Sequence, residues 1–293
     1  MQKGRYYLGR VVKINLDQER LIGAIKSSPT ITVGKFDWTI TDVVHDQVGK
    51  DTFVFGKLAK YAREGHAKVI DEDSRSQVDA DVPNLLEASS SFVYLPSCSG
   101  IAFLHVWNGI QEDVFPRRFK SVIEAAFDSF FIACDVEPVS DYRAFTTRLK
   151  KLNYFIELSA TVYPPNPLFG RLWSSLNDYI ERRNASEVTV KEQSSKVKGL
   201  NSNIIGLMDH IMETSDYIPS EAPAIADAAI LMAADGYGRG KVVGIEDGGD
   251  EVVIKTSDTQ KSFLYSKEPI PFELAVKAKN QFDKISTDRD MRH

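Results

Sequence analysis

Hydrophobic and polar residues alternate over several stretches of the first hundred positions, and this period of two is typical of β-strands with one buried face. Valine, isoleucine and aromatic residues, which favour strands, fill many of the hydrophobic positions. Gly49-Lys50-Asp51 and Ser97-Cys98-Ser99-Gly100 separate neighbouring runs with residues that favour tight turns. The pattern predicts an antiparallel meander sheet. Its strands are expected at residues 5–14, 36–48, 52–61, 85–96 and 100–107, with a short helix at 17–26.

Two further stretches of this region differ from the strand pattern. Residues 64–82 are strongly polar and include Asp71-Glu72-Asp73, so we expect a loop or an exposed extension of the ribbon there. From residue 111 to 131, hydrophobic residues recur every three or four positions, which is typical of an amphipathic helix. We expect this helix to pack on the meander sheet. Its hydrophobic face consists of Phe115, Phe119, Val122, Ile123, Ala126, Phe127 and Phe130.

Short strands and helices alternate after residue 134, which indicates α/β or α+β packing. Ser140-Asp141 offers an N-cap for one of these helices. The expected elements are strands 134–139, 154–163 and 187–192, the hairpin 240–245 with 251–256, and helices 141–152, 168–183, 200–214, 221–234 and 271–285.

The predicted fold class is therefore α+β, with an antiparallel meander sheet packed on an amphipathic helix and a second α/β domain. We place the N-terminal globular α+β domain at residues 1–134, completed by the C-terminal helix 264–293. The second α/β domain is expected at residues 135–263 and is expected to be mobile.

Composition restricts the class of protein further. With 43% hydrophobic and 26% charged residues, the chain can form an ordinary globular core. No stretch approaches the roughly 20 apolar residues that cross a bilayer, and the first residues lack a signal peptide. We therefore expect a cytoplasmic protein without membrane insertion. Cys98 and Cys134 are too few for a disulfide framework, and we expect buried free thiols.

The sequence shows no clear catalytic or metal-binding constellation. Asp250-Glu251 with Lys255 superficially suggests a metal-dependent nuclease, but no further acidic ligand is evident and an exposed hairpin is the favoured interpretation. The histidines are scattered, without the four-residue helical spacing of a zinc protease. They are His45, His66, His105, His210 and His293. We expect no catalytic residue, no metal and no cofactor, and a binding protein rather than an enzyme.

Charge leaves nucleic-acid binding open. The formal net charge of −5, from 36 basic and 41 acidic residues, argues against a uniformly basic surface but allows a local basic face. If the basic clusters meet on one face, they can bind phosphates without reading bases, whereas solvated helix faces are the alternative interpretation. The glycine-rich segment 236–241 is either a flexible turn or a phosphate-contacting loop, and it lacks the order of a Walker motif. The candidate nucleic-acid-binding residues are Arg117, Arg118, Lys120, Arg148, Lys150, Lys151, Arg182, Arg183, Lys196, Lys198, Arg239 and Lys241.

Three stretches of the chain resemble the RexA phage-exclusion protein family. They are Thr52-Phe-Val-Phe-Gly-Lys-Leu58, Val136-Glu-Pro138 and Gly240-Lys-Val-Val-Gly-Ile-Glu-Asp-Gly-Gly-Asp-Glu-Val-Val-Ile254. The order of the predicted elements is also similar to that family. The resemblance implies a globular domain formed by the N-terminal region and the returning C-terminal helix, with a mobile domain inserted between them. It further implies a homodimer that binds DNA without marked sequence preference and acts in phage exclusion or defence.

Three functions follow from these observations. The first is a non-enzymatic, sequence-nonspecific DNA-binding protein of a phage-exclusion or anti-phage defence system, whose DNA binding should depend steeply on salt. The second is a protein-interaction module, such as a phage-encoded inhibitor of a host defence complex. The third is a metal-dependent nuclease, which would cleave DNA only with a divalent ion. We expect the first.

Overall fold

The structure is a computed structural model that describes residues 2–127, 131–164, 169–195, 198–214, 217, 219–289 and 291–292. Its first half is an eight-stranded antiparallel sheet, and the predicted α+β class is confirmed. The strands of this sheet are β1 (Lys3–Ile14), β2 (Ile31–Val33), β3 (Phe36–Val48), β4 (Asp51–Asp71), β5 (Ser76–Leu95), β6 (Gly100–Leu104), β7 (Ala133–Pro138) and β13 (Ser262–Ser266). Their order is β13-β1-β6-β5-β4-β3-β2, and β7 pairs with β1 beyond the end of β13.

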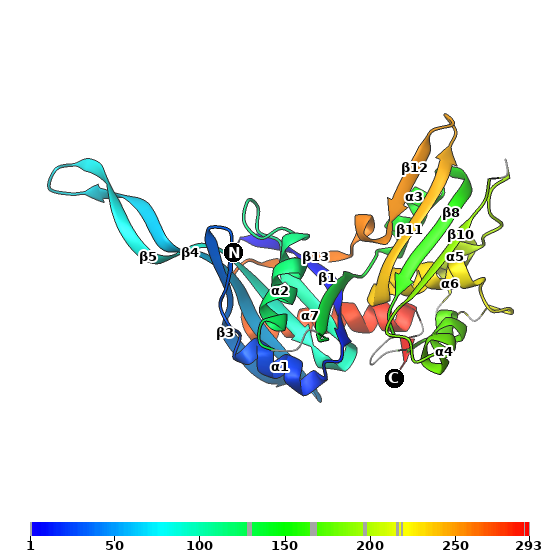
Figure 1. Ribbon diagram of the computed structural model, residues 1–293, viewed down its shortest axis with the longest axis horizontal. Helices are drawn as coiled ribbons and strands as arrows, with labels where there is room; N and C mark the ends of the chain where they lie inside the picture. Colours follow the sequence, from blue (N-terminus) through cyan, green and yellow to red (C-terminus); the bar gives the residue numbers. More distant parts are fainter. Residues whose placement is uncertain are drawn as a thin grey trace.

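Helices pack on both faces of this sheet, and the core is formed between the layers (Figure 1). These helices are α1 (Gln18–Lys26), α2 (Val114–Glu124) and α7 (Pro271–Asp288). On the face of α1 and α2, the rings of Phe115 and Phe119 lie 5.7 and 5.5 Å from that of Phe92. On the face of α7, Gly100 makes room for the Phe282 ring, because a Cβ atom there would lie 2.7 Å from it.

The helix predicted over residues 111–131 is shorter in the structure, because α2 ends at Glu124. The Glu124 carboxylate accepts a hydrogen bond of 3.1 Å from the backbone N–H of Cys134, at the start of β7. Phe127 is not part of the helical face, since its ring lies under the Arg20 guanidinium of α1 at 4.9 Å. Phe130 lies outside the described residues. The tertiary contacts of the next strand and of α1 therefore determine where the helix ends.

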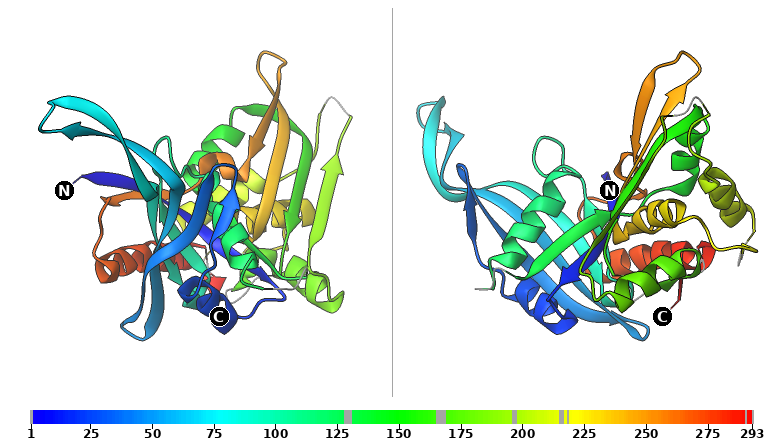
Figure 2. Two further views of the ribbon diagram at one scale, coloured as in Figure 1. Left: turned by 60° about the vertical axis from the view of Figure 1, so that its left-hand side comes forward. Right: turned by 45° about the vertical axis from the view of Figure 1, so that its right-hand side comes forward.

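A second, four-stranded antiparallel sheet forms the other half of the molecule, in the order β10-β8-β11-β12. Figure 2 (right) shows this sheet nearly edge-on, with helices on one side of it and an open face on the other. Its elements are β8 (Leu152–Val162), β10 (Val188–Gln193), β11 (Gly238–Glu246) and β12 (Glu251–Lys255) with helices α3 (Tyr142–Leu149), α4 (Ser174–Arg182), α5 (Ile204–Glu213) and α6 (Ile225–Met232). Two short strands, β9 (Phe169–Gly170) and β14 (Met291–Arg292), pair with each other.

The two halves share a hydrophobic core, and the predicted domain boundaries do not separate the two sheets. The predicted boundary at residue 135 falls inside β7, where Asp135 pairs with Val12 of β1, so β7 belongs to the first sheet. β13 returns the chain to that sheet and crosses the second predicted boundary at 263. One hydrophobic cluster also combines buried residues of both halves, such as Leu8 of β1 and Leu158 of β8.

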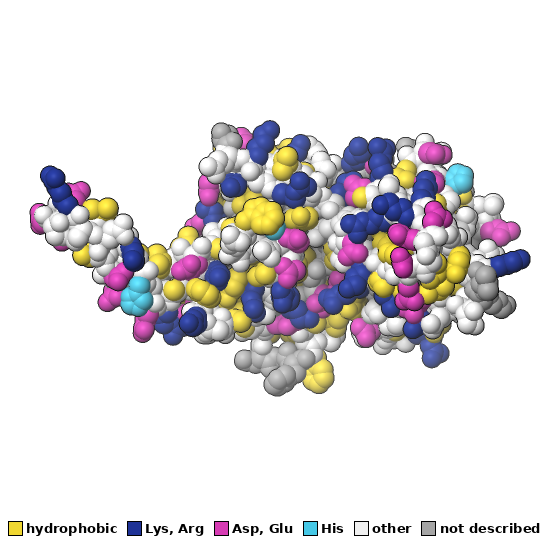
Figure 3. Space-filling model, turned by 90° about the horizontal axis from the view of Figure 1, so that it is seen from above, with side chains coloured by type: hydrophobic (Ala, Val, Ile, Leu, Met, Phe, Trp, Pro, Cys, Tyr) yellow, Lys and Arg dark blue, Asp and Glu magenta, His cyan; other side chains and the backbone are white. Residues whose placement is uncertain are grey.

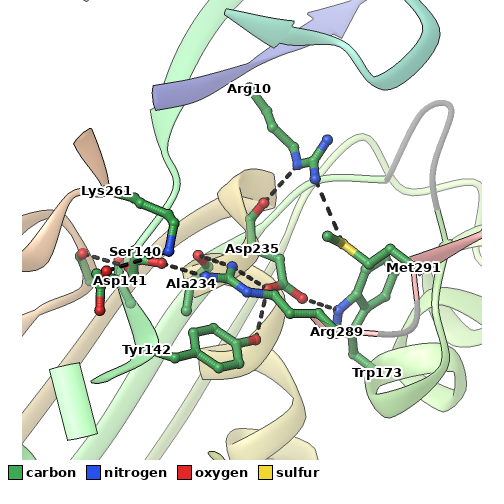
Figure 4. Close-up of polar contacts among 11 residues, drawn as sticks. Arg10, Ser140, Asp141, Tyr142, Trp173, Ala234, Asp235, Lys261, Arg289 and Met291 are labelled. Carbon is green, nitrogen blue, oxygen red and sulfur yellow. Dashed lines mark hydrogen bonds and ion pairs between the residues drawn. The ribbon is translucent and has the colours of Figure 1, made fainter. Parts of the chain in front are cut away.

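A buried polar network connects the two halves of the molecule at their junction (Figure 4). Asp235 lies in the turn Ala233–Tyr237 between α6 and β11. Its carboxylate accepts hydrogen bonds from the Tyr142 hydroxyl at 2.7 Å, from the Trp173 indole at 2.8 Å and from the Arg289 guanidinium at 2.8 Å. Its backbone carbonyl accepts a fourth, of 2.8 Å, from Arg10 of β1. The contacts tie β1, α3, the α6–β11 turn and the C-terminal segment together.

Residues 64–83 extend β4 and β5 into a two-stranded ribbon that protrudes from the body, which we call the arm (Figure 1). The exposed extension predicted for the polar stretch 64–82 is thus a regular antiparallel hairpin, with pairing from Glu64–Pro83 to Asp71–Ser76. Glycine at position 65 fits the close approach of the strands, because a Cβ atom there would lie 2.3 Å from the Cβ of Leu85.

Both cysteines lie as the sequence predicts. Cys98 and Cys134 are buried and free, and burial raises the pKa of both thiols. Among the helices of the described residues, none combines the length and apolar character needed to span a membrane.

Candidate nucleic-acid interface

The open face of the second sheet carries basic and hydroxyl side chains in register. Side chains alternate along a strand, so Gly238, Gly240 and Val242 of β11 face the helices while Arg239 and Lys241 face outward. Paired residues on neighbouring strands share a face. One row across the sheet consists of Lys191, Ser159, Lys241 and Lys255, and the next consists of Thr189, Thr161 and Arg239. We call the four cations Lys191, Arg239, Lys241 and Lys255 the basic face.

Carboxylates lie beneath three of these cations, Lys191, Lys241 and Arg239, and hold them in place. Glu157 lies 2.6 Å from the Lys241 amine and 3.0 Å from the Lys191 amine. Glu137 of β7 accepts hydrogen bonds of 2.9 and 3.1 Å from Nε of Arg239. The carboxylate side chains are only 10% and 1% exposed, whereas the Arg239 side chain is 68% exposed. The positively charged side chain of each ion pair is therefore exposed to solvent.

The ion pairs also set the protonation of the acids. Hydrogen bonds from Lys241 and Lys191 lower the pKa of Glu157 from its ordinary value of 4.5. Burial raises the pKa of Glu137, and the Arg239 guanidinium opposes this effect. The same pair raises the pKa of Arg239, so that guanidinium stays charged at every physiological pH.

The basic face continues toward α2 through a shared carboxylate. Asp135 of β7 lies 2.9 Å from Lys120 of α2 and 3.7 Å from Arg239 of β11. A cavity of about 430 Å³ opens next to this contact, between β7, β8, β11 and the turn after β12, and the hydroxyls of Ser159 and Thr161 line it together with Arg239, Lys241 and Lys255. Figure 3 shows Lys and Arg side chains gathered over this half of the molecule, with acidic side chains among them. Cations and hydroxyl donors around an open cavity are suited to phosphate oxygens.

The structure brings three of the twelve sequence candidates together, namely Lys120, Arg239 and Lys241. Five others have local partners. Arg117 pairs with Asp113 on the same helix at 2.6 Å, Arg118 lies 5.4 Å from the Trp38 ring, Arg148 pairs with Asp258 at 3.6 Å, Lys150 pairs with Asp209 at 2.8 Å, and Arg182 donates to the Asp178 carbonyl at 3.1 Å.

The remaining candidates are Lys151, Arg183, Lys198 and Lys196. The first three are exposed and form no ion pair with any residue that the structure describes. Lys196 lies outside the described residues. Lys150 and Lys151 directly follow α3, which packs on the helix-covered side of the second sheet. The predicted clusters therefore do not all converge on one face.

Sequence reasoning missed Lys191 and Lys255 as members of this face. Each is a single basic residue on its strand, so neither forms a cluster along the chain. The segment 236–241 is not a flexible turn or loop over its whole length. β11 starts at Gly238, so residues 238–241 are part of a strand that pairs with β8. The available signal was the alternation of outward-facing polar residues on the predicted strands, but only the register shows that these positions share a row.

The described residues hold no group of three or more His, Cys, Asp or Glu side chains placed to bind a metal ion.

The fold and this face together define an α+β protein with an open, cation-bearing antiparallel sheet. The chain belongs to the family described as a domain of unknown function (DUF4747), whose profile matches residues 19–217, more than half of the chain. No curated protein matches it. The matched range contains Lys120, Glu157 and Lys191 but ends before β11 and β12.

Proposed function

We propose that the protein binds DNA without sequence preference, by contacting backbone phosphates with the basic face. The observation that carries this proposal is the row of Lys191, Lys241 and Lys255 across the open sheet, with the hydroxyl of Ser159 between two of the lysines. Lysine, arginine and hydroxyl groups are the usual partners of phosphate oxygens, and such contacts carry no direct base information. The role is non-enzymatic.

The resemblance to the RexA family gives this binding a setting in phage exclusion or anti-phage defence. Such a role belongs in the cytoplasm, where phage DNA is replicated. A homodimer, which the same resemblance implies, would present two basic faces on one particle. Linking two weak sites raises the effective concentration of the second, so a dimer would bind long DNA more tightly than a single chain.

The test compares two triple variants that remove the same charge from different places. In the first, Lys191, Lys241 and Lys255 are replaced by alanine, and in the matched control Lys151, Arg183 and Lys198 are. Each phosphate contact contributes about 0.9 to the slope of log affinity against log salt for duplex DNA. The first variant should flatten that slope by about 2.7, equally for unrelated duplexes, while the control should leave it within error of the wild type.

For a third variant we expect a gain in affinity for duplex DNA. Glu157→Gln removes the carboxylate that competes with phosphates for the Lys191 and Lys241 amines, so duplex affinity at low salt should rise. The DNA proposal is wrong if the wild type binds neither duplex nor single strands at low salt, and a protein partner then becomes the better explanation. If the two triple variants lose affinity equally, the basic face is not the binding site.

A further inference from the structure

Trp107 stands at the tip of a tight loop between β6 and α2. Val106 and Ile110 close this loop, because the N–H of each donates a hydrogen bond to the carbonyl of the other, at 2.9 and 3.0 Å. Ile110 is fully buried, whereas Trp107 is 79% exposed. The other two residues of the tip, Asn108 and Gly109, have no apolar side chain. The loop therefore holds one large aromatic ring in solvent, in a fixed position.

The Trp107 ring is supported by His105. The two rings lie 4.8 Å apart at an angle of 77°, which is an edge-to-face contact. The His105 ring lies 6.0 Å from that of Tyr7 on β1, and its Nδ1 atom lies 2.6 Å from a carboxylate oxygen of Glu112. The His105 side chain is only 9% exposed, so a packed residue fixes the tryptophan while most of the Trp107 surface stays available to a ligand.

A cation lies beside these rings on β1. Arg5 and Tyr7 are two positions apart on this strand, so both side chains lie on the side of the sheet that α2 covers. The Arg5 guanidinium donates a hydrogen bond of 2.9 Å to the Ser262 hydroxyl of β13, and it forms no ion pair with any residue that the structure describes. Asp113, at the end of the loop, pairs instead with Arg117 at 2.6 Å. Arg5 is therefore available to a phosphate.

The Trp107 loop and the basic face lie on the same side of the molecule. Figure 2 (right) shows the open face of the second sheet turned toward α2 and the loop before it. Ser257 lines the cavity at the basic face, and the chain from there to Ser262 spans at most about 18 Å, at about 3.6 Å per residue. In Figure 1 this loop points upward, to the side on which Figure 3 shows hydrophobic side chains among Lys and Arg. One extended ligand can therefore reach both places.

We propose that the protein prefers single-stranded over duplex DNA, with an unpaired base stacked on Trp107 and the phosphates on Arg5 and the basic face. This inference rests on the proposed function, because it names the form of DNA that the basic face accepts. Every base has an aromatic face, so stacking on a side-chain ring adds affinity without sequence preference. Bases inside a duplex are already stacked on their neighbours, so a duplex offers the protein its backbone but not a free base.

A protein partner fits this surface less well. The core of a protein interface joins several apolar residues into one buried patch. The tip of the loop instead holds a single ring between His105 and the polar Asn108. One ring with a cation nearby is sufficient for a base and its phosphate, as in proteins that bind single strands.

The test measures the affinity of the full chain for three probes at one salt concentration. They are a thymine single strand of about 15 nucleotides, an abasic strand with the same number of phosphates, and a duplex of the same length. The wild type should bind the thymine strand more tightly than the duplex. Trp107→Ala should weaken binding of the thymine strand by about 5- to 150-fold, the range for one stacked base, and leave binding of the abasic strand unchanged. Trp107→Phe keeps an aromatic ring and should retain most of the affinity.

Phe272→Ala is the matched control. Phe272 is an aromatic residue at the start of α7 that is 48% exposed, and α7 covers the opposite side of the sheet. This variant should bind all three probes like the wild type.

Tryptophan fluorescence reports on the contact directly. Trp38 and Trp173 are 4% and 0% exposed, so Trp107 is the tryptophan that a ligand on the surface can reach. The thymine strand should quench the fluorescence of the wild type, and Trp107→Phe should lose this quenching.

The outcomes separate this inference from the proposed function. If the wild type binds no probe, both are wrong. If it binds DNA but Trp107→Ala binds the thymine strand like the wild type, or if the wild type prefers the duplex, the inference is overturned while the proposed function stands, and Trp107 is left to a protein partner. Equal losses of Trp107→Ala on the thymine and abasic strands also overturn it, since stacking requires a base.

Discussion

Removing the buried carboxylate of Asp235 should destabilise the fold by several kcal/mol. Its side chain is 1% exposed and that of Arg289 is 4% exposed, with 2.8 Å between the charged groups. Removing one partner of a buried ion pair costs about 3–5 kcal/mol, because the other charge is left without compensation. Asparagine has the same size as aspartate, so Asp235→Asn creates no cavity. Its NH₂ group cannot accept a hydrogen bond, so Tyr142 or Trp173 also loses an acceptor.

A double-mutant cycle separates the ion pair from the other contacts. We expect Asp235→Asn and Arg289→Met each to lower the free energy of unfolding by about 3–5 kcal/mol. The double variant leaves neither of these two charges without its partner, so its loss should be smaller than the sum of the single losses by about 1–3 kcal/mol. Both single losses are large against a typical total stability of about 5–15 kcal/mol.

Urea denaturation followed by circular dichroism measures the four free energies. The double variant is informative even if one single variant fails to fold, because its rescue would itself show the coupling. If the losses simply add, the two charges do not stabilise each other and the reasoning is refuted. If Asp235→Asn changes stability by less than about 1 kcal/mol, the network does not pin the junction.

Further changes test the packing, the backbone and the charge of the fold. Phe119→Ala should cost about 3–5 kcal/mol because the ring is fully buried, and an unchanged urea midpoint would contradict its place in the core. Gly238→Ala should cost about 1–3 kcal/mol in the same assay, because Gly238 has a φ of 155° and a Cβ atom would clash with the Thr161 carbonyl. The control Gly248→Ala, in the open hairpin turn, should have little effect on stability. Because its lysine partners lower the pKa of Glu157 from 4.5, the stability from this carboxylate is complete above that value and is lost as the pH falls through the lower folded-state pKa. Glu157→Gln should therefore lose less stability than the wild type on acidification, and equal losses would contradict the ion-pair geometry.

Local signals in the sequence were sufficient for most of the secondary structure. The predicted N-cap is present, because the Asp141 carboxylate accepts a hydrogen bond of 3.1 Å from the Ala144 N–H. The hairpin of β11 and β12 follows from its glycine-containing turn, and the arm from its polar pattern. These features depend on residues close together in the chain. The end of α2 does not, because it depends on Glu124 meeting a strand ten residues later and on Arg20 binding Phe127.

Pairing between distant strands could not be predicted in the same way. Nothing in residues 133–138 indicates that β7 pairs with β1, since a strand pattern specifies which residues are buried but not the neighbouring strand. The basic face could not be predicted for the same reason. Lys191, Lys241 and Lys255 share a row only because β8 lies between β10 and β11 with this register. The search for basic clusters along the chain instead selected residues such as Arg117, which pairs with Asp113 at the start of its own helix.

The distribution of charge explains why the acidic net charge does not decide the partner of this protein. Of the net −5, the arm carries −4, so the rest of the chain carries only −1. Within that remainder, Glu137 and Glu157 lie beneath the cations they pair with, and the exposed groups of the basic face are positive. Removing the arm should therefore raise the low-salt affinity of the chain for DNA, because a repulsive charge of −4 is removed while the basic face is retained. Binding titrations would compare the wild type with a chain in which residues 64–83 are replaced by a short turn. Equal DNA affinity of the two chains would show that the charge of the arm is too far from the bound phosphates to matter.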